Sequence, residues 1–155
     1  MAGAIKPITI KRGGQFLMLK IMSPDGVSFL EEHQNIISKK HYVWFCRFGK
    51  CNLLVNSIGR DGQYLFVKES KKHGGGRYLL EFSEVTSEAP KNGYPSYYDE
   101  VDADKSLWFK VTAIHKLSDD FEKHFETSSS GNSLDSVYRS MCNSFYIMCH
   151  KDFVV

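Results

Sequence analysis

The chain has 155 residues and a formal net charge of +2, with 42% hydrophobic and 25% charged residues. This composition excludes an intrinsically disordered chain, so we expect residues 1–155 to form a single compact domain. No apolar run approaches the roughly 20 residues of a membrane helix, and the N-terminus lacks the apolar segment of a secretory signal. We therefore expect an intracellular protein, cytoplasmic or nuclear, with no membrane partner.

The charges are unevenly distributed along the chain. Residues 1–77 hold 13 Lys+Arg and 5 Asp+Glu (+8), whereas residues 78–155 hold 7 and 13 (−6), which together give +2. Such asymmetry favours a basic face that binds a polyanion, although folding can also interleave the two halves.

The first half of the chain predicts a buried strand, a helix and further short strands. The nearly continuous apolar run QFLMLKIM (15–22) is typical of a strand buried on both faces. Ser23 and Pro24 follow as a candidate helix cap and first helical residue, and the predicted helix ends at Lys39 and Lys40. Glycine-punctuated strands are then expected at 41–48, 63–70 and 76–85.

The second half predicts one more strand and a terminal helix. Residues 107–117 alternate between apolar and polar positions, as in a half-buried strand. Residues 133–150 carry apolar side chains at helical spacing, which predicts a helix packed on the sheet. Together the elements indicate an α+β domain with a curled, barrel-like mixed sheet and flanking helices.

No motif for catalysis, a metal or a cofactor is present in the sequence. HGGGR (73–77) resembles an oxyanion turn, but the G-x-S-x-G nucleophile motif that it requires is missing, as are the P-loop, Rossmann and H-E-x-x-H motifs. The cysteine spacings C-x4-C and C-x6-C do not match a zinc site. We expect a non-enzymatic domain without catalytic residues, metal or cofactor; a nucleophile at Cys46 or Cys149 stays open.

Aromatic residues interleaved with cations form the strongest chemical signal. KKHYVWFCRFGK (39–50) combines four aromatic rings with Lys39, Lys40, Arg47 and Lys50. Side chains alternate across a strand, so one of Trp44 and Phe45 should point outward or into a pocket, unless both fill the core. A base stacked on such a ring gains about 1–3 kcal/mol, and nearby cations hold phosphates.

The order of several segments resembles the EVE domain. YLLEFSEVTSEAP and the following YPSYYDEVDADKSLWFKVTAIHKL are similar to the family's strand, YYD loop and aromatic-led strand. FLMLKIMSPD, WFCRFGKCN and IGRDGQYLFVKES resemble its upstream segments more loosely, so the match covers about 16–117. The chain is about one residue shorter than the family pattern between Trp44 and Arg47, and again between Arg47 and Asn52. It also has Asp61-Gly62 where the family has Gly-Asp.

This resemblance implies a PUA-like fold, related to that of YTH domains, and an aromatic cage for a flipped base of DNA or RNA, often modified by methylation. A flipped base needs ring faces on both sides and polar groups at its edge. On this interpretation the chain itself supplies ring faces, groups that read the base edge, and cations for the phosphates. The ring faces would come from Trp44 with Tyr94, Tyr97 or Tyr98. The base edge would be read by Ser23 and Asn52, and the phosphates would be held by Lys39, Lys40, Arg47 and Lys50.

Three interpretations remain open at the level of sequence. The first is a nucleic-acid reader. The second is a protein-interaction module that keeps the fold without base binding and contacts a partner through the tyrosine-rich loop at 94–98. The third is a Cys-dependent enzyme. Neither the oligomeric state nor the choice between DNA and RNA follows from the sequence.

Overall fold

The computed structural model describes residues 8–21, 23–49, 58–70, 74–118, 121–127, 131, 144–149 and 151–155. Within these ranges the chain forms nine strands, one α-helix and two short 3-10 helices. None of these helices is long and apolar enough to cross a membrane. In chain order the elements are β1 (Thr9–Ile10), β2 (Gln15–Ile21), α1 (Phe29–Lys40), β3 (Val43–Arg47), β4 (Tyr64–Glu69), β5 (Arg77–Thr86), η3 (Ser96–Glu100), β6 (Leu107–Lys116), η4 (Phe121–His124), β7 (Phe125–Thr127), β8 (Ser144–Cys149) and β9 (Phe153–Val154).

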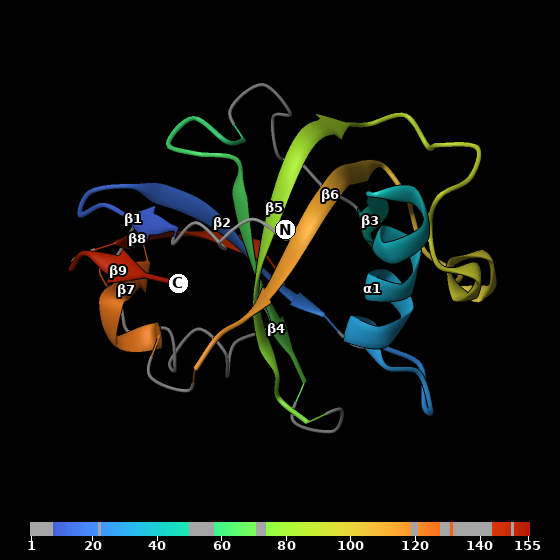
Figure 1. Ribbon diagram of the computed structural model, residues 1–155, viewed down its shortest axis with the longest axis horizontal. Coiled ribbons are helices and arrows are strands. Elements are labelled where there is room, and N and C mark those ends of the chain that lie inside the picture. Colours follow the sequence, from blue (N-terminus) through green and yellow to red (C-terminus); the bar gives the residue numbers. More distant parts are fainter. Residues whose placement is uncertain are drawn as a thin grey trace, which may run out of the picture.

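Seven strands form one twisted mixed sheet in the order β3-β6-β5-β4-β2-β8-β7. The pair β2–β4 is parallel, and the other neighbours are antiparallel. The short strands β1 and β9, the first and last strands of the described residues, pair separately (Figure 1). The α+β class is confirmed. The expected barrel-like closure is wrong, because the end strands β3 and β7 do not pair with each other.

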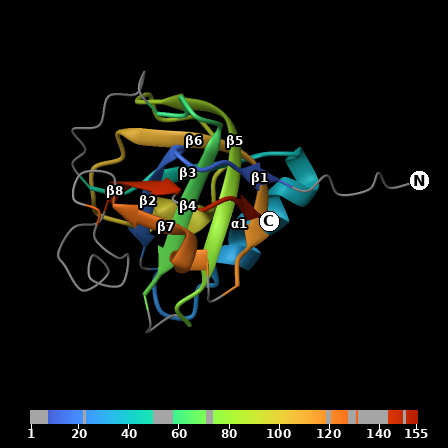
Figure 2. The same cartoon turned by 90° about the vertical axis from the view of Figure 1, so that its left-hand side faces the viewer.

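The sheet separates two hydrophobic cores. Alternation along β2 sends Leu17 and Leu19 to the core under α1, and Phe16 and Met18 to the core under the β1–β9 ribbon. Figure 2 shows α1 on one side of the central strands β4 and β5, with β7 and β8 on the other. This double coverage explains the continuous apolar run at β2, which is buried on both faces.

Helix α1 begins later than the sequence suggested. The cap is Ser28, whose Oγ accepts a hydrogen bond from the Glu31 N–H at 3.2 Å, so the prediction of a cap at Ser23 is wrong. The predicted end is confirmed: Lys39 and Lys40 occupy the last turn, and His41 closes it in the left-handed region at φ 68°.

The prediction of a C-terminal helix at 133–150 is wrong for residues 144–149, the part of this range that the structure describes. Residues 144–149 form the strand β8, which lies between β2 and β7. The six-residue apolar run SFYIMC fits a helix or a strand equally well by pattern. Pairing decides in favour of the strand, because β8 hydrogen-bonds the edge of β2 that β4 leaves open. Residues 132–143 lie outside the described part of the chain.

Candidate functional site

The segment at 93–104 covers the exposed edge of β3. The Trp44 N–H donates to the Gly93 carbonyl at 2.8 Å, and the Gly49 N–H donates to the Asp104 carbonyl at 2.9 Å. Between them the Cys46 N–H donates to the phenol oxygen of Tyr98 at 3.4 Å. An edge strand with unpaired N–H groups is a template for aggregation, and this segment removes that hazard.

Tyr98 is the centre of an aromatic cluster built against this edge. We call aromatic cluster the buried Cys46, Tyr98 and Trp108 together with the half-buried Trp44, Phe48, Tyr94 and Tyr97. The Tyr98 ring is only 1% exposed and lies nearly parallel to the Tyr94 ring, with 5.8 Å between centroids and 12° between planes. Because Tyr98 fills the interior, it supports the other rings and does not itself offer a face to a base.

The Tyr98 hydroxyl links η3 to α1. His33 lies in α1, and its Nδ1 is 2.7 Å from the Phe29 carbonyl, an acceptor, so Nδ1 carries the proton. Its Nε2 therefore accepts the short hydrogen bond from the Tyr98 hydroxyl. Burial lowers the pKa of His33 to about 4, against a smaller opposing effect of the Phe29 hydrogen bond. A neutral histidine thus holds the cluster in place.

The outer face of β3 presents the ring of Trp44. Phe45 is buried at 2% exposure against α1, whereas Trp44 is half-buried on the opposite face, as the alternation predicts. Lys110 of β6 lies opposite Trp44 in the register, and its Nζ lies 4.6 Å from the ring centroid of Tyr42. An aromatic and cationic surface therefore runs along the outer side of β3 and β6.

Ser23 and Tyr97 meet at the other side of Tyr98, beside the start of α1. Ser23 is 5% exposed, and its side chain hydrogen-bonds the Tyr97 hydroxyl. Burial raises the pKa of Tyr97, although the Ser23 hydrogen bond acts in the opposite direction. The ring of Tyr97 lies edge-on to His33, with 6.3 Å between centroids. Tyr94 and Tyr97 thus both pack on the ring of Tyr98, and Ser23 lies on the Tyr97 side of it.

The expected phosphate-binding cations do not all lie together. Lys39 and Lys40 are exposed at the end of α1, directly before β3. Arg47 lies at the opposite end of β3 and is half-buried, with one guanidinium nitrogen 3.4 Å from the Phe48 carbonyl. Lys50 and the base-reading candidate Asn52 lie outside the described residues.

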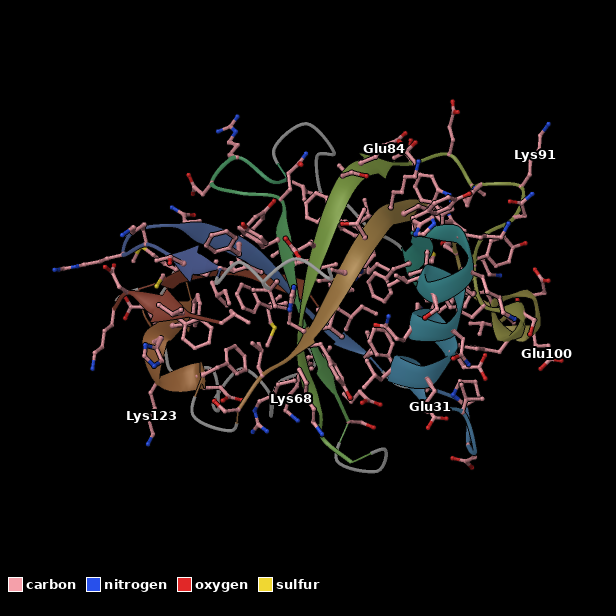
Figure 3. The ribbon with its side chains drawn as sticks, viewed as in Figure 1. Glu31, Lys68, Glu84, Lys91, Glu100 and Lys123 are labelled. Carbon is pink, nitrogen blue, oxygen red and sulfur yellow. The ribbon has the colours of Figure 1, made fainter. Side chains whose placement is uncertain are left out.

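The acidic side chains of the loop face solvent. Asp99, Glu100, Asp102 and Asp104 are all exposed. The Tyr94 hydroxyl donates to Asp99 Oδ1 at 3.0 Å, and this hydrogen bond is the main reason why the pKa of Tyr94 is raised. Figure 3 places Glu100 and Lys91 on the same side of the molecule as the cluster, with Lys123 at the far end.

The two described cysteines, Cys46 and Cys149, have thiols that are harder to ionise than usual. Burial raises the pKa of the Cys46 thiol to about 12 and also raises that of Cys149, so neither forms a thiolate readily. In the described part of the chain, no group of three or more His, Cys, Asp or Glu side chains is placed to hold a metal ion. The half-buried rings of the aromatic cluster pack on the buried Tyr98 and Trp108.

Sequence reasoning missed three residues that shape this surface. Tyr42 is half-exposed beside Lys110, Trp108 is buried under Tyr94, and His33 anchors Tyr98. Trp108 was detectable, because it alternates with the inward-facing Leu107 on β6. The role of His33 was not detectable from the sequence, because it depends on a contact with Tyr98, 65 positions further along the chain.

Comparison of this chain with family models, with curated proteins and with solved structures found no match in any of the three.

Proposed function

We propose that this chain is a nucleic-acid-binding domain that stacks a flipped base, and in particular a methylated one, on the aromatic cluster. The PUA-like fold suggested by the EVE resemblance is part of the same proposal. The observation that carries it is that Trp44, Tyr94 and Tyr97 stay half-exposed although the buried Tyr98 and Trp108 hold them. Aromatic rings that stay partly accessible can stack a planar ligand.

The support beneath these rings favours binding. The cluster is fixed by the hydrogen bonds of Tyr98 to His33 and Cys46, and by that of Trp108 Nε1 to the Lys105 carbonyl at 2.8 Å. A ring that is already held in place loses little conformational entropy when a base stacks on it. The surface is therefore organised in advance for a flat, apolar ligand.

Cations near the cluster suit a polyanion. Lys39 and Lys40 are exposed at the end of α1, and Lys110 lies opposite Trp44 on the neighbouring strand. Each phosphate that such a side chain neutralises steepens the salt dependence of binding. The exposed acids at 99–104 would repel a backbone on their side. The backbone of the bound nucleic-acid strand is thus expected to run from the aromatic cluster towards the lysines.

The test is binding to fluorescent oligonucleotides at about 100 mM salt. The panel holds single- and double-stranded DNA and RNA, plain, with methylated or hydroxymethylated cytosine, and with methylated adenine. Trp44→Ala should weaken binding roughly tenfold or more, because base stacking is worth about 1–3 kcal/mol. Tyr64→Ala is the matched control, since Tyr64 is half-buried against the other core. Equal binding by both variants would contradict the proposal.

A protein-interaction module is the second candidate. It is favoured by the complete burial of Tyr98, which leaves its ring closed to a ligand. Absence of binding to every oligonucleotide, with a folded protein, would favour this candidate. The two functions therefore separate in the same experiment.

A further inference from the structure

A second candidate site lies where β4 ends and β5 begins. A cleft of 330 Å³ opens there, lined by the glycines at 74–76, by Glu69, Arg77 and Tyr78, and by residues 116–117. A Cβ added at Gly74 would meet nothing within 4 Å among the described residues, so none of them fills the space beside this glycine. The cleft has the size of a site for a small ligand.

The wall of this cleft holds a buried carboxylate with few partners. Glu69 is only 6% exposed, and its Oε1 accepts a hydrogen bond from the Tyr78 hydroxyl at 2.9 Å. Tyr78 is the one hydrogen-bond donor that the Glu69 side chain has among the described residues. Buried carboxylates normally have several donors or a cation beside them, so this group is suited to receive donors from a ligand.

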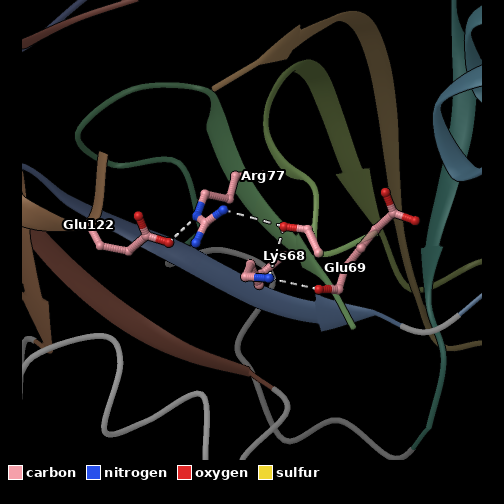
Figure 4. A network of polar contacts seen from close by, with 5 residues as sticks. Lys68, Glu69, Arg77 and Glu122 are labelled. Atoms are coloured by element: carbon pink, nitrogen blue, oxygen red, sulfur yellow. Dashed lines mark hydrogen bonds and ion pairs between the residues drawn. The ribbon is translucent and has the colours of Figure 1, made fainter. Parts of the chain in front are cut away.

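The neighbouring cations are directed elsewhere. Lys68 Nζ donates to the carbonyl oxygens of Glu69 and Gly75, at 3.0 and 2.9 Å, and Arg77 Nε pairs with Glu122. Figure 4 shows the Glu69 carboxylate pointing away from these charges. Lys116, which is exposed, lies opposite Tyr78 in the register of β5 and β6. One wall of the cleft therefore offers acceptors, and the exposed Lys116 gives positive charge on the other.

The turn keeps the carboxylate within reach. A Cβ added at Gly76 would lie 2.5 Å from the Tyr78 hydroxyl oxygen and 2.9 Å from Glu69 Oε1. Only glycine allows the backbone to pass this close to the pair.

A carboxylate has two parallel acceptor oxygens, so it pairs best with two parallel N–H donors. A guanidinium group and the Watson–Crick edge of guanine both offer this pattern. The exposed Lys116, which has the register position opposite Tyr78, favours a ligand that carries a phosphate over a cationic guanidinium. Uracil and adenine set an acceptor beside their donor, which a carboxylate repels.

We propose that the cleft between Glu69 and Lys116 binds a guanine nucleotide, with the guanine edge on Glu69 and the phosphate near Lys116. The cleft has its own lining and does not rest on the proposed function, although Glu69 also acts electrostatically on Tyr97 of the aromatic cluster. An oligonucleotide without guanine can bind at the cluster while this cleft stays empty.

The experiment is a titration of the ¹⁵N-labelled protein with nucleoside monophosphates, followed by NMR. GMP should bind about tenfold more tightly than IMP, which lacks the 2-amino donor, and also more tightly than AMP or UMP. The shifted resonances should be those of Gly74, Gly75 and Tyr78. Equal affinities for GMP, IMP and inorganic phosphate would overturn the proposal, as would tighter binding of arginine.

Two variants test the two walls separately. Glu69→Gln keeps the size of the side chain and should abolish the preference for GMP over IMP. Lys116→Ala should weaken GMP several-fold without affecting binding of guanosine, and Lys91→Ala is its control, because Lys91 is exposed and Figure 3 shows it well away from Lys68. If Glu69→Gln does not fold, the comparison of GMP with IMP on the unaltered chain still decides. Retained GMP preference in a folded Glu69→Gln protein would contradict the assignment.

Discussion

The backbone N–H of Cys46 donates to the phenol oxygen of Tyr98, 52 positions further along the chain, at 3.4 Å. The same hydroxyl donates to the neutral His33 in α1. One oxygen therefore joins the edge of the sheet, the 93–104 segment and the helix. The position of the exposed rings depends on this junction.

Replacing Tyr98 by phenylalanine tests the junction. The change leaves the buried His33 Nε2 and the Cys46 N–H without their partner, which should lower the free energy of unfolding by about 1–3 kcal/mol. Urea denaturation gives this value. Tyr64→Phe is the control, because the Tyr64 hydroxyl makes no hydrogen bond to any described residue. Equal stability of the two variants would show that the hydroxyl of Tyr98 contributes nothing.

The stability of the fold should fall between pH 6.5 and 4. The pKa of His33 is lowered from 6.5 to about 4, so in this range the unfolded chain binds more protons than the folded one. The contribution is complete above about pH 6.5, is lost as the pH falls towards 4, and amounts to roughly 3 kcal/mol.

His33→Gln removes the titrating group. The difference in unfolding free energy between this variant and the unaltered chain should therefore shrink as the pH is lowered from 7 to 4. Denaturation series at half-unit steps of pH measure it. Parallel curves for the two proteins would mean that His33 titrates alike in the folded and unfolded states.

Most strands were predictable from the sequence because their alternation is local. The strands β2 to β6 occur within one or two residues of the expected ranges. The start of α1 was not predictable in this way, since Ser23-Pro24 fits a helix start by residue type, whereas the hydrogen bond from the Glu31 N–H places the cap at Ser28. The strand β8 depends on the free edge of β2, which a local pattern does not reveal.

The candidate site was predictable in its residue types and less so in its arrangement. The tyrosine-rich loop does lie against Trp44, through the Gly93 carbonyl. That Tyr98 is buried and that Tyr97 turns towards Ser23 depends on contacts between distant segments. Alternation gives the face of a strand, whereas the direction of a loop side chain follows from what it packs against.

Gly93→Ala should loosen the loop from β3. Gly93 has φ 86°, and a Cβ there would lie 3.1 Å from Tyr42 Cε2 and 3.2 Å from Trp44 Cδ1. Gly26→Ala is a matched control, with φ 79° and nothing within 4 Å of the added Cβ. Both variants bear the left-handed strain of about 1–2 kcal/mol, so the extra loss in Gly93→Ala measures the contact. Thermal or urea unfolding gives both values, and equal losses would contradict this account.

The cap of α1 can be tested in the same way. Ser28→Ala removes the acceptor of the Glu31 N–H and should destabilise the protein by about 1 kcal/mol. Ser38→Ala is the control within the same helix, where Ser38 Oγ only donates to the Gln34 carbonyl at 3.0 Å, and should be close to neutral. If the order of these two effects were reversed, the assigned helix start would be incorrect.

The most direct test of nucleic-acid binding uses the two tryptophans of the chain, Trp44 and Trp108. Each gives one indole N–H resonance, and that of Trp108 is held by the Lys105 carbonyl beneath the cluster. When a single-stranded oligonucleotide is added, the Trp44 resonance should shift in a saturable manner, while that of Trp108 moves far less. If neither resonance moves while the oligonucleotide binds, the bound strand lies elsewhere and the aromatic cluster is not the site.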